Sequence, residues 1–382
     1  MNPYPIYLDY NATTPCDPQV VEAMLPFFSV HFGNAASKSH AHGWYAEEVV
    51  AQAREQVAEL IGASSSEIIF TSGATESINI AIQGIAEKHA TKGKHIITIA
   101  TEHKAVLDVY DYLETQGYSV AILPVNKEGM IDLDQLQSAI QEETILIAAM
   151  YANNETGVVH PVAAIGAIAR QRSIPFFCDA TQAVGKIPVD VNKDHIDMMA
   201  FSGHKMYGPK GVGALYVRKK DPKIEISPLF YGGGHERKLR SGTLNVPGIV
   251  GLGKASALCQ SAMQEEAVRL RSYRDIFWDA IKDLSGVSWN GQQEKSLSHV
   301  ANICFDLPRG DNLIKLLTKH MSVSSGSACS SAIVAPSHVL KAMGLSDEQA
   351  HASIRFSMGR FTTDEEVKML AEEVTRALSR MQ

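Results

Sequence analysis

The chain has 382 residues, of which 45% are hydrophobic and 20% are charged, and its formal net charge is −7 at pH 7. These values are ordinary for a globular protein, and the length suits one large domain with a smaller one, or two comparable domains. The negative charge argues against direct nucleic-acid binding, and no run of about 18 uninterrupted apolar residues predicts a membrane span. The N-terminus lacks the basic and apolar regions of a signal peptide, so we expect a cytoplasmic protein.

Short apolar runs alternate with helix-period segments between about residues 67 and 218. The predicted strands are 68–71, 95–100, 120–125, 145–150, 176–179, 198–201 and 212–217, and the helices between them are 75–88, 105–115, 133–140 and 162–170. This alternation predicts a mostly parallel sheet with helices on both faces. In such sheets ligands bind at the carboxyl ends of the strands.

The flanking segments predict further elements. A helix over 44–61 precedes the alternating region and ends at Gly62, a plausible C-terminal cap. A long amphipathic helix over about 250–284 follows it and leads to a second unit. That unit is predicted to contain a strand at 300–306, a helix at 312–320, a strand at 353–357 and a closing helix from residue 363.

The five cysteines fall into two groups. Their odd number and the absence of a CxxC pair fit a reducing compartment rather than a disulfide framework. Cys178 and Cys304 lie in apolar runs and Cys259 on a predicted helix, so we expect three buried structural thiols, whereas Cys16 lies in a turn-like segment and can be exposed. Cys329 differs, because it lies in Val-Ser-Ser-Gly-Ser-Ala-Cys-Ser-Ser, a run that cannot pack a core. A thiol on such a tether is expected to move and react.

A turn rich in small residues, Ser72-Gly-Ala-Thr-Glu76, links the first strand of the alternating region to a helix. The unpaired N–H groups and positive dipole end of that helix suit a phosphate group. A plain helix cap by Ser72 or Thr75 is the alternative.

Two further residues follow strands of the same predicted sheet. Asp179 ends the strand 176–179, where an acid can hold a cofactor ring nitrogen in its protonated form, although a helix-capping aspartate is an equal alternative. Lys205 follows the strand 198–201 in Ser202-Gly-His-Lys205. An isolated loop lysine is usually a surface lysine, but desolvation here would free its amine to form a Schiff base. The three signals together favour one cofactor site.

A set of motifs in order along nearly the whole chain resembles the NifS/IscS-type cysteine desulfurases of the class-V aminotransferase family. The motifs run from Tyr7-Leu-Asp-Tyr-Asn-Ala-Thr-Thr14 to Ile354-Arg-Phe-Ser-Met-Gly-Arg360, with Thr71-Ser-Gly-Ala-Thr-Glu-Ser77, Thr101-Glu-His103, Asn153-Asn-Glu-Thr-Gly157, Asp179-Ala-Thr-Gln182, Ser202-Gly-His-Lys205, Arg240-Ser-Gly-Thr243 and Ser324-Ser-Gly-Ser-Ala-Cys-Ser330 between them. The last motif resembles the first group of this family, whose cysteine loop is long.

The resemblance implies a fold-type I, aspartate-aminotransferase-like homodimer with pyridoxal 5′-phosphate on Lys205. It implies a large cofactor domain over 16–260, and a smaller α+β domain over 1–15 and 261–382 that carries Cys329 and Arg355.

The resemblance also implies a role for each site residue. Asp179 would bind the pyridine nitrogen, and Gln182 and Asn154 would face the phenolic oxygen. The phosphate would be held by Ala74, Thr75, Ser202 and His204, together with Thr243 from the neighbouring subunit. His103 would stack on the ring and transfer protons. Arg355, with Asn154, would bind the substrate carboxylate, and no metal is expected.

The implied reaction converts L-cysteine to L-alanine and leaves the sulfur on Cys329 as a persulfide. The acceptor would be a protein of iron–sulfur cluster assembly, tRNA thiolation or DNA phosphorothioation. The sequence stops at Ser379-Arg-Met-Gln382, without the tail that docks the scaffold protein in housekeeping members, so the acceptor stays open. An aminotransferase or another lyase, a selenocysteine lyase activity, and an inactive assembly platform remain alternatives.

Overall fold

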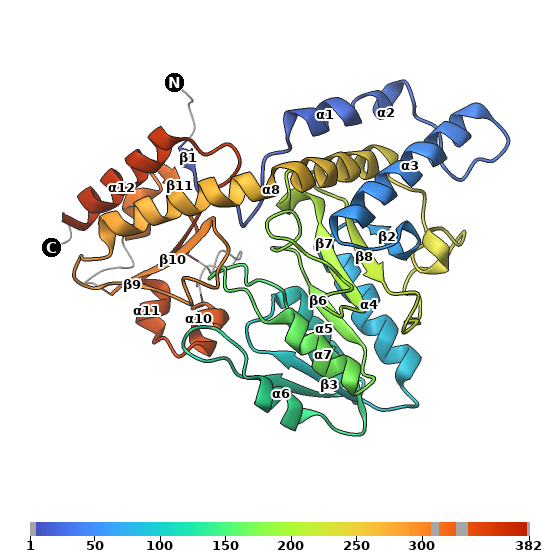
Figure 1. Ribbon diagram of the computed structural model, residues 1–382, viewed down its shortest axis with the longest axis horizontal. Helices are drawn as coiled ribbons and strands as arrows, with labels where there is room; N and C mark the ends of the chain where they lie inside the picture. Colours follow the sequence, from blue (N-terminus) through green and yellow to red (C-terminus); the bar gives the residue numbers. More distant parts are fainter. Residues whose placement is uncertain (1–4, 307–312, 326–334, 380–382) are drawn as a thin grey trace.

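The computed structural model describes residues 5–306, 313–325 and 335–379. Figure 1 shows a larger unit built around a central sheet and a smaller unit beside it, with the long helix α8 (Val246–Ile281) running along both. No helix in the described ranges is long and apolar enough to cross a membrane.

The central sheet has seven strands in the order β2-β8-β7-β6-β5-β3-β4. Their bounds are β2 Ile68–Thr71, β3 His95–Ile99, β4 Ser119–Leu123, β5 Thr144–Ala148, β6 Phe176–Asp179, β7 Met198–Ser202 and β8 Gly213–Val217. Only β8 of these seven runs against its neighbours, β2 and β7, and the other pairs are parallel. The prediction of a mostly parallel sheet is therefore confirmed.

Helices cover both faces of this sheet. Helices α4 (Ala74–His89) and α5 (Lys104–Thr115) bury residues such as Ile82 and Val109 in a core on one face. On the other face lies a core formed by α3 (Ala41–Leu60), α6 (Leu133–Ala139), α7 (Val162–Gln171) and the first part of α8. Because both faces are covered, all residues of β2, β3, β5, β6, β7 and β8 are buried. Of the seven strands only the edge strand β4 has exposed residues.

The smaller unit shares α8 with the larger one. This helix of 36 residues buries Leu252 in the core of the central sheet, and Leu270 and Phe277 in a third core. The third core also contains α9 (Leu313–Leu317), α12 (Asp364–Ser379) and the antiparallel sheet of β9 (Val287–Trp289), β10 (Val300–Phe305) and β12 (Ser353–Ser357).

The N-terminal segment joins the smaller unit. Strand β1 (Ile6–Tyr7) pairs in parallel with β11 (Met321–Ser322), and Asp9 bridges to Ser357 at the end of β12. The chain then enters the larger unit through α1 (Pro18–Met24) and α2 (Pro26–Ser29). The domain division at residues 15/16 and 260/261 stays a prediction.

The long predicted elements are present, with ends shifted by a few residues. Helix α8 starts before the predicted residue 250, because the Asn245 side chain accepts from the Gly248 N–H and caps it there. It ends at Ile281, before the predicted residue 284. The prediction missed short elements without apolar periodicity: α1, α2, α10 (His338–Ala342), α11 (Asp347–His351), β1, β9, β11 and the 3-10 turns Ser65–Glu67, Gly203–Lys205 and Glu236–Lys238. The helix predicted at 312–320 begins outside the described residues, and α9 ends at Leu317.

Candidate active site

A cavity of about 890 Å³ lies where the carboxyl ends of the central strands meet the N-terminal segment and β12. The sheet contributes Ser72 after β2, His103 after β3, Asp179 at the end of β6 and Lys205 after β7, and Arg355 enters from β12. The residues at these strand ends line one cavity, as the sequence predicted.

The turn between β2 and α4 has the geometry of an anion site. Helix α4 starts at Ala74, and its N-cap Gly73 has φ +155° and makes no side-chain capping bond. The alternative of a plain cap by Ser72 or Thr75 is therefore wrong, and the first N–H groups of this helix have no acceptor within it. Gly213 makes room for the turn, because a Cβ there would lie 2.7 Å from the Gly73 Cα.

Lys205 ends a 3-10 turn directly after β7. Its Nζ donates hydrogen bonds to the main-chain carbonyls of Asn11 (2.6 Å) and Ala12 (2.8 Å). Burial, with the positive charge of Arg355, lowers the pKa of Lys205 to about 8. The neutral, nucleophilic amine is thus far more accessible near neutral pH than for a surface lysine.

His204 lies beside the amine. Its Nδ1 shares a hydrogen bond of 3.1 Å with the Thr13 hydroxyl, and its main-chain carbonyl accepts from the Thr14 N–H at 2.9 Å. Burial, with Lys205 and Lys210 nearby, lowers the pKa of His204 to about 4. The ring is therefore neutral at physiological pH.

Asp179 is buried at the end of β6, and its Oδ1 accepts from the Thr181 N–H at 3.0 Å. The segment after Asp179 is a series of turns, so this carboxylate does not cap a helix as the alternative required. Gln182, also buried, donates through Nε2 to the Asn11 carbonyl at 3.0 Å. Burial and the nearby Asp179 raise the pKa of Glu102, a second buried acid, well above its usual value.

His103 caps helix α5. Its Nδ1 accepts from the Ala105 N–H at 3.1 Å, and its ring opens onto the cavity. Although the side chain has access to the cavity, the protein around it lowers the pKa of His103 by desolvation, and Asp179 opposes that shift.

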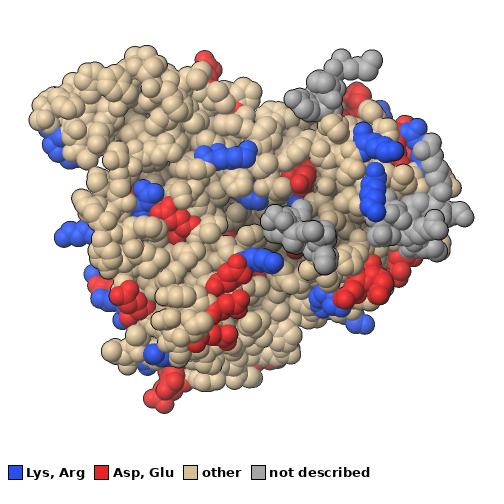
Figure 2. All heavy atoms as spheres, turned by 180° about the vertical axis from the view of Figure 1, so that it is seen from behind, with Lys and Arg blue, Asp and Glu red and all other residues tan. Residues whose placement is uncertain are grey.

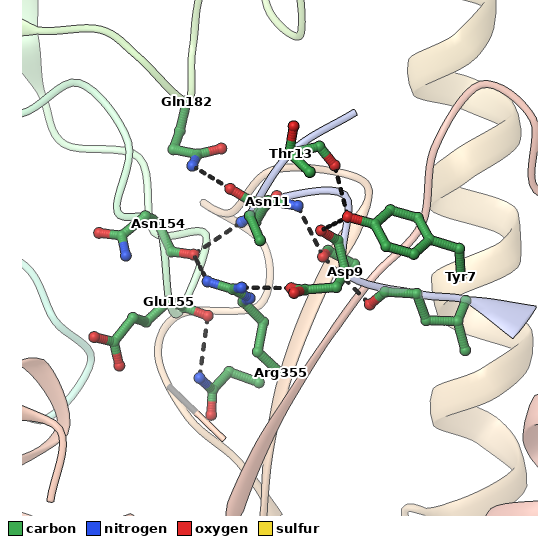
Figure 3. Close-up of polar contacts among 12 residues, drawn as sticks. Tyr7, Asp9, Asn11, Thr13, Asn154, Glu155, Gln182 and Arg355 are labelled. Carbon is green, nitrogen blue, oxygen red and sulfur yellow. Dashed lines mark hydrogen bonds and ion pairs between the residues drawn. The ribbon is translucent and has the colours of Figure 1, made fainter. Parts of the chain in front are cut away.

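Arg355 is buried on β12 and is held by two oxygen atoms, as Figure 3 shows. Its Nη2 forms an ion pair with Asp9 Oδ1 at 2.6 Å, and its Nη1 donates to the Asn154 main-chain carbonyl at 2.8 Å. Within the described part of the chain its Nε has no hydrogen-bond partner. The Asn154 amide points away from Arg355 (Figure 3), although Asn154 also lines the cavity.

The N-terminal segment supplies contacts to which the sequence reasoning gave no role. The Asn11 carbonyl accepts from both Lys205 and Gln182, and the Asn11 side chain donates to the Asn154 carbonyl at 3.0 Å. Buried His299 anchors the same side chain through Nε2 at 2.8 Å from Oδ1. The available signal was the motif Tyr7–Thr14, which the resemblance included without a function for its members.

Two predicted site residues are not brought to this cavity by the described chain. Thr243 is exposed in the loop before α8 and does not belong to the described lining. Cys329 lies outside the described residues. The prediction of three buried thiols is confirmed for Cys178, Cys259 and Cys304, and Cys16 is partly buried.

Comparisons with known proteins agree with this geometry. The model of the family "Aminotransferase class-V" matches residues 6–370. Cysteine desulfurase IscS proteins of Pectobacterium carotovorum subsp. carotovorum (strain PC1) and Salmonella typhi are each 52% identical over 379 residues, covering 99% of this chain and 93% of theirs.

Solved structures give the same result. A NifS-like protein is 38% identical with a TM-score of 0.91, and the match covers 98% of this chain and 100% of that one. SspA in complex with cysteine is 38% identical with a TM-score of 0.82 over 94% and 100% of the two chains. DndA from Streptomyces lividans is 38% identical with a TM-score of 0.78 over 91% and 97%.

Proposed function

Since the chain belongs to the class-V aminotransferase family and is a pyridoxal 5′-phosphate-dependent cysteine desulfurase, we propose that it converts L-cysteine to L-alanine with Cys329 as the sulfur acceptor. Cys329 then carries the sulfur as a persulfide to an acceptor protein. The observation that supports this most directly is an amine of lowered pKa, Lys205, in one cavity with the buried Asp179 and Arg355.

The residues of the cavity fit pyridoxal 5′-phosphate. The uncapped N-terminus of α4 offers N–H groups to a phosphate, and buried Asp179 offers a carboxylate to a protonated ring nitrogen. When bound, the cofactor supplies an electron sink for the carbon atoms of the amino acid. We assign the phosphate to Ala74, Thr75, Ser202 and His204, and to Thr243 from the neighbouring copy.

Gln182 and Asn154 would contact the phenolic oxygen of the cofactor. Gln182 has a fixed direction, because its Nε2 bonds to the Asn11 carbonyl. Lys205 would hold the aldehyde carbon and, as a free amine, move the proton at the substrate α-carbon. Its pKa of about 8 suits this task, because a base works best when its pKa lies near the operating pH.

Arg355 would bind the substrate carboxylate. Asp9 and the Asn154 carbonyl hold its guanidinium in place, and the buried Nε still has a hydrogen to donate. The planar guanidinium binds a carboxylate through two parallel hydrogen bonds, which a lysine cannot do. The site therefore favours a small α-amino acid with its carboxylate at β12.

His103 would stack on the cofactor ring and take part in proton transfer at the carbon that loses sulfur. Cys329 must react as a thiolate, because the thiol, with an ordinary pKa of about 8.5, is a poor nucleophile. The Gly- and Ser-rich sequence around Cys329 suits a flexible tether that also reaches an acceptor outside the cavity.

We further propose a cytoplasmic homodimer. Large apolar side chains are exposed on α1 to α3 and the segments between them, among them Leu25, Phe28, Val30, Phe32 and Trp44. Figure 2 shows few charged side chains on this part of the rear face, in the upper left. A second copy would cover this apolar surface and could bring its Thr243, exposed here, to the phosphate site.

The acceptor of the sulfur is left open among iron–sulfur cluster assembly, tRNA thiolation and DNA phosphorothioation. Iron–sulfur cluster assembly is the leading candidate, because the motifs of the chain resemble the NifS/IscS-type desulfurases. The fold is also shared by DndA and by SspA, whose names differ from IscS, so the fold alone does not identify the acceptor.

The experiment is incubation of the holoenzyme with L-cysteine and a reducing thiol, followed by assays of alanine and sulfide. Equal amounts of alanine and sulfide are expected, with no keto acid required, whereas an aminotransferase would need one. The Cys329→Ser variant should bind cofactor but make almost no alanine. Borohydride reduction and peptide mass spectrometry should mark Lys205, and a label on any other residue would refute the assignment.

A further inference from the structure

Two residues after Lys205 the main chain adopts a conformation that bulky residues rarely take. Tyr207 has φ +63°, in the left-handed region, and its side chain is fully buried. Its N–H donates to the Thr14 hydroxyl at 2.8 Å, and its carbonyl accepts from the Asp17 N–H at 2.9 Å. Such a conformation persists only where the surrounding structure fixes it, and it is most often found at functional sites. The contacts that hold Tyr207 therefore also hold the turn that ends at Lys205.

The Tyr207 side chain contacts two cations. The Arg360 Cζ lies 4.1 Å from the centroid of the ring, and the Lys186 Nζ lies 4.4 Å from it. The Tyr207 hydroxyl accepts from the Arg360 main-chain N–H at 2.7 Å and from the Lys186 amine at 3.4 Å. A cation over an aromatic ring is attracted more strongly when both are shielded from water. Ring and hydroxyl thus both attach the segment after Lys205 to Arg360.

Arg360 belongs to the smaller unit, three residues after the end of β12. Its Nη1 forms an ion pair with Asp17 Oδ2 at 2.8 Å, and its Nε forms one with Glu266 Oε1 at 2.5 Å. Asp17 caps α1, and Glu266 lies within α8. One guanidinium group therefore connects the segment after β12 to α1, α8 and the Tyr207 ring. Because Arg355 lies on β12, this set of contacts joins the two sides of the cavity.

We propose that Tyr207 and Arg360 are positioning residues, which hold the Lys205 amine at a fixed place relative to Arg355. Neither of the two lines the described cavity, so they act through the turn Gly203–Lys205 and not on the substrate. The inference rests on the proposed function, in which Lys205 moves the substrate proton and Arg355 binds the carboxylate. It adds the contact that fixes the distance between them. Proton transfer is sensitive to that distance, because a displacement of about 1 Å can cost about 100-fold in rate.

The test is Tyr207→Phe, which keeps the ring beside both cations and removes the hydroxyl. We expect kcat for alanine formation, expressed per bound cofactor, to fall by roughly 3- to 10-fold, as for the loss of one hydrogen bond. The KM for L-cysteine should stay near the wild-type value, because Arg355 keeps its contacts with Asp9 and the Asn154 carbonyl. The kinetic isotope effect with L-cysteine deuterated at the α-carbon should rise, because a misplaced amine slows the transfer of that hydrogen.

The chain offers a matched control on β8. Tyr216 is also fully buried, and the Arg218 Cζ lies 6.0 Å from its ring centroid. Arg218 in turn forms an ion pair with Asp197 at 3.1 Å. Neither Tyr216 nor Arg218 lines the described cavity. Tyr216→Phe and Arg218→Lys should therefore leave kcat and the isotope effect unchanged, whatever they do to stability.

A second readout does not depend on turnover. In the turn, the Met206 and Gly208 N–H groups both donate to the Gly203 carbonyl, at 3.0 and 2.9 Å. Hydrogen–deuterium exchange of the apoenzyme, followed by mass spectrometry of peptides over 203–208, should be faster in Tyr207→Phe than in wild type. The same peptides should exchange at the wild-type rate in Tyr216→Phe.

A Tyr207→Phe enzyme that only unfolds at lower urea concentration, with unchanged kcat, isotope effect and exchange, would overturn the inference. A rise in KM with unchanged kcat would overturn it as well. If Tyr207→Phe does not fold, Arg360→Lys decides by the same measurements, because one ammonium group cannot reach both carboxylates and stay over the ring. The proposed function would survive a negative result, and it would fail if the wild type made no alanine.

Discussion

The two walls of the cavity are built in different ways. On the sheet wall, Asp179 ends a strand of the central sheet, His103 and Lys205 follow two others, and all three side chains line the cavity. On the opposite wall, the N-terminal segment contributes mainly main-chain carbonyls, those of Asn11 and Ala12. The comparison indicates that the sheet supplies chemical groups and that the segment next to β12 fixes their positions.

The largest effect is expected on the sheet wall. Lys205→Ala should reduce alanine formation by roughly 10²- to 10⁴-fold, because it removes the residue proposed to move the proton at the substrate carbon. Alanine can be measured by mass spectrometry under substrate saturation. Lys220→Ala, in an exposed position after β8, is the control and should retain full activity. A Lys205→Ala enzyme with a near-normal rate of alanine formation would show that Lys205 does not move the substrate proton.

The next effect concerns Arg355, the side chain that crosses from the smaller unit. Arg355→Lys keeps the positive charge but loses the planar fork, so the KM for L-cysteine should rise by roughly 10- to 100-fold, with a smaller change in kcat. Steady-state kinetics separates the two constants. A loss confined to kcat would mean that Arg355 acts on the reaction and does not bind the substrate carboxylate.

Asp9 should have a smaller effect, because it acts through Arg355. Asp9→Asn keeps an acceptor near Nη2 but removes the charge, and the KM for L-cysteine should rise by roughly 2- to 5-fold. The same change should lower the pKa of Lys205, because the negative charge of Asp9 now raises it and Arg355 lowers it. Titration of the apoenzyme amine with an amine-reactive probe across pH measures this shift, and an upward shift would contradict the arrangement.

The smallest effect is on stability. The pKa of Lys205 falls from its ordinary value of about 10.4 to about 8 on folding, so between these values the unfolded chain binds more protons. Stability should therefore rise with pH across this window. Between pH 7 and pH 10 the free energy of unfolding of the wild-type apoenzyme should rise by about 1–2 kcal/mol more than that of Lys205→Met, after allowance for the partial exposure of the amine. Urea unfolding at both pH values gives this number, and equal pH dependence in the two proteins would show that the amine is not desolvated.

The sequence predicts the sheet wall well. Buried strands are apolar runs between turn residues, and a polar residue at the end of such a run is visible without coordinates, as for Asp179 and Lys205. The direction of β8 is not visible in this way, because an apolar run such as Gly213–Val217 has no intrinsic polarity. Its reversal depends on pairing with β2 and β7.

The opposite wall could be recognised only in part. Arg355 was recognised by family resemblance, but the carbonyls of Asn11 and Ala12 could not be, because every residue has a carbonyl and only the fold brings these two to the Lys205 amine. His338 also lines the cavity, with its Nε2 2.9 Å from the main-chain carbonyl of Glu102. The sequence reasoning missed it because α10 has five residues and no apolar periodicity, and because its partner is a main-chain oxygen.

The pair of carbonyls that holds Lys205 has a consequence for how amines exchange in the cavity. When the Lys205 amine bonds to carbon, it keeps fewer N–H bonds than the ammonium ion has. The carbonyls of Asn11 and Ala12 then need a hydrogen-bond donor from another group. The ammonium group of an incoming amino acid carries three N–H bonds. One nitrogen can thus replace another at these two oxygens with little net loss of hydrogen bonding, and the N-terminal segment can remain where β1 and β11 anchor it.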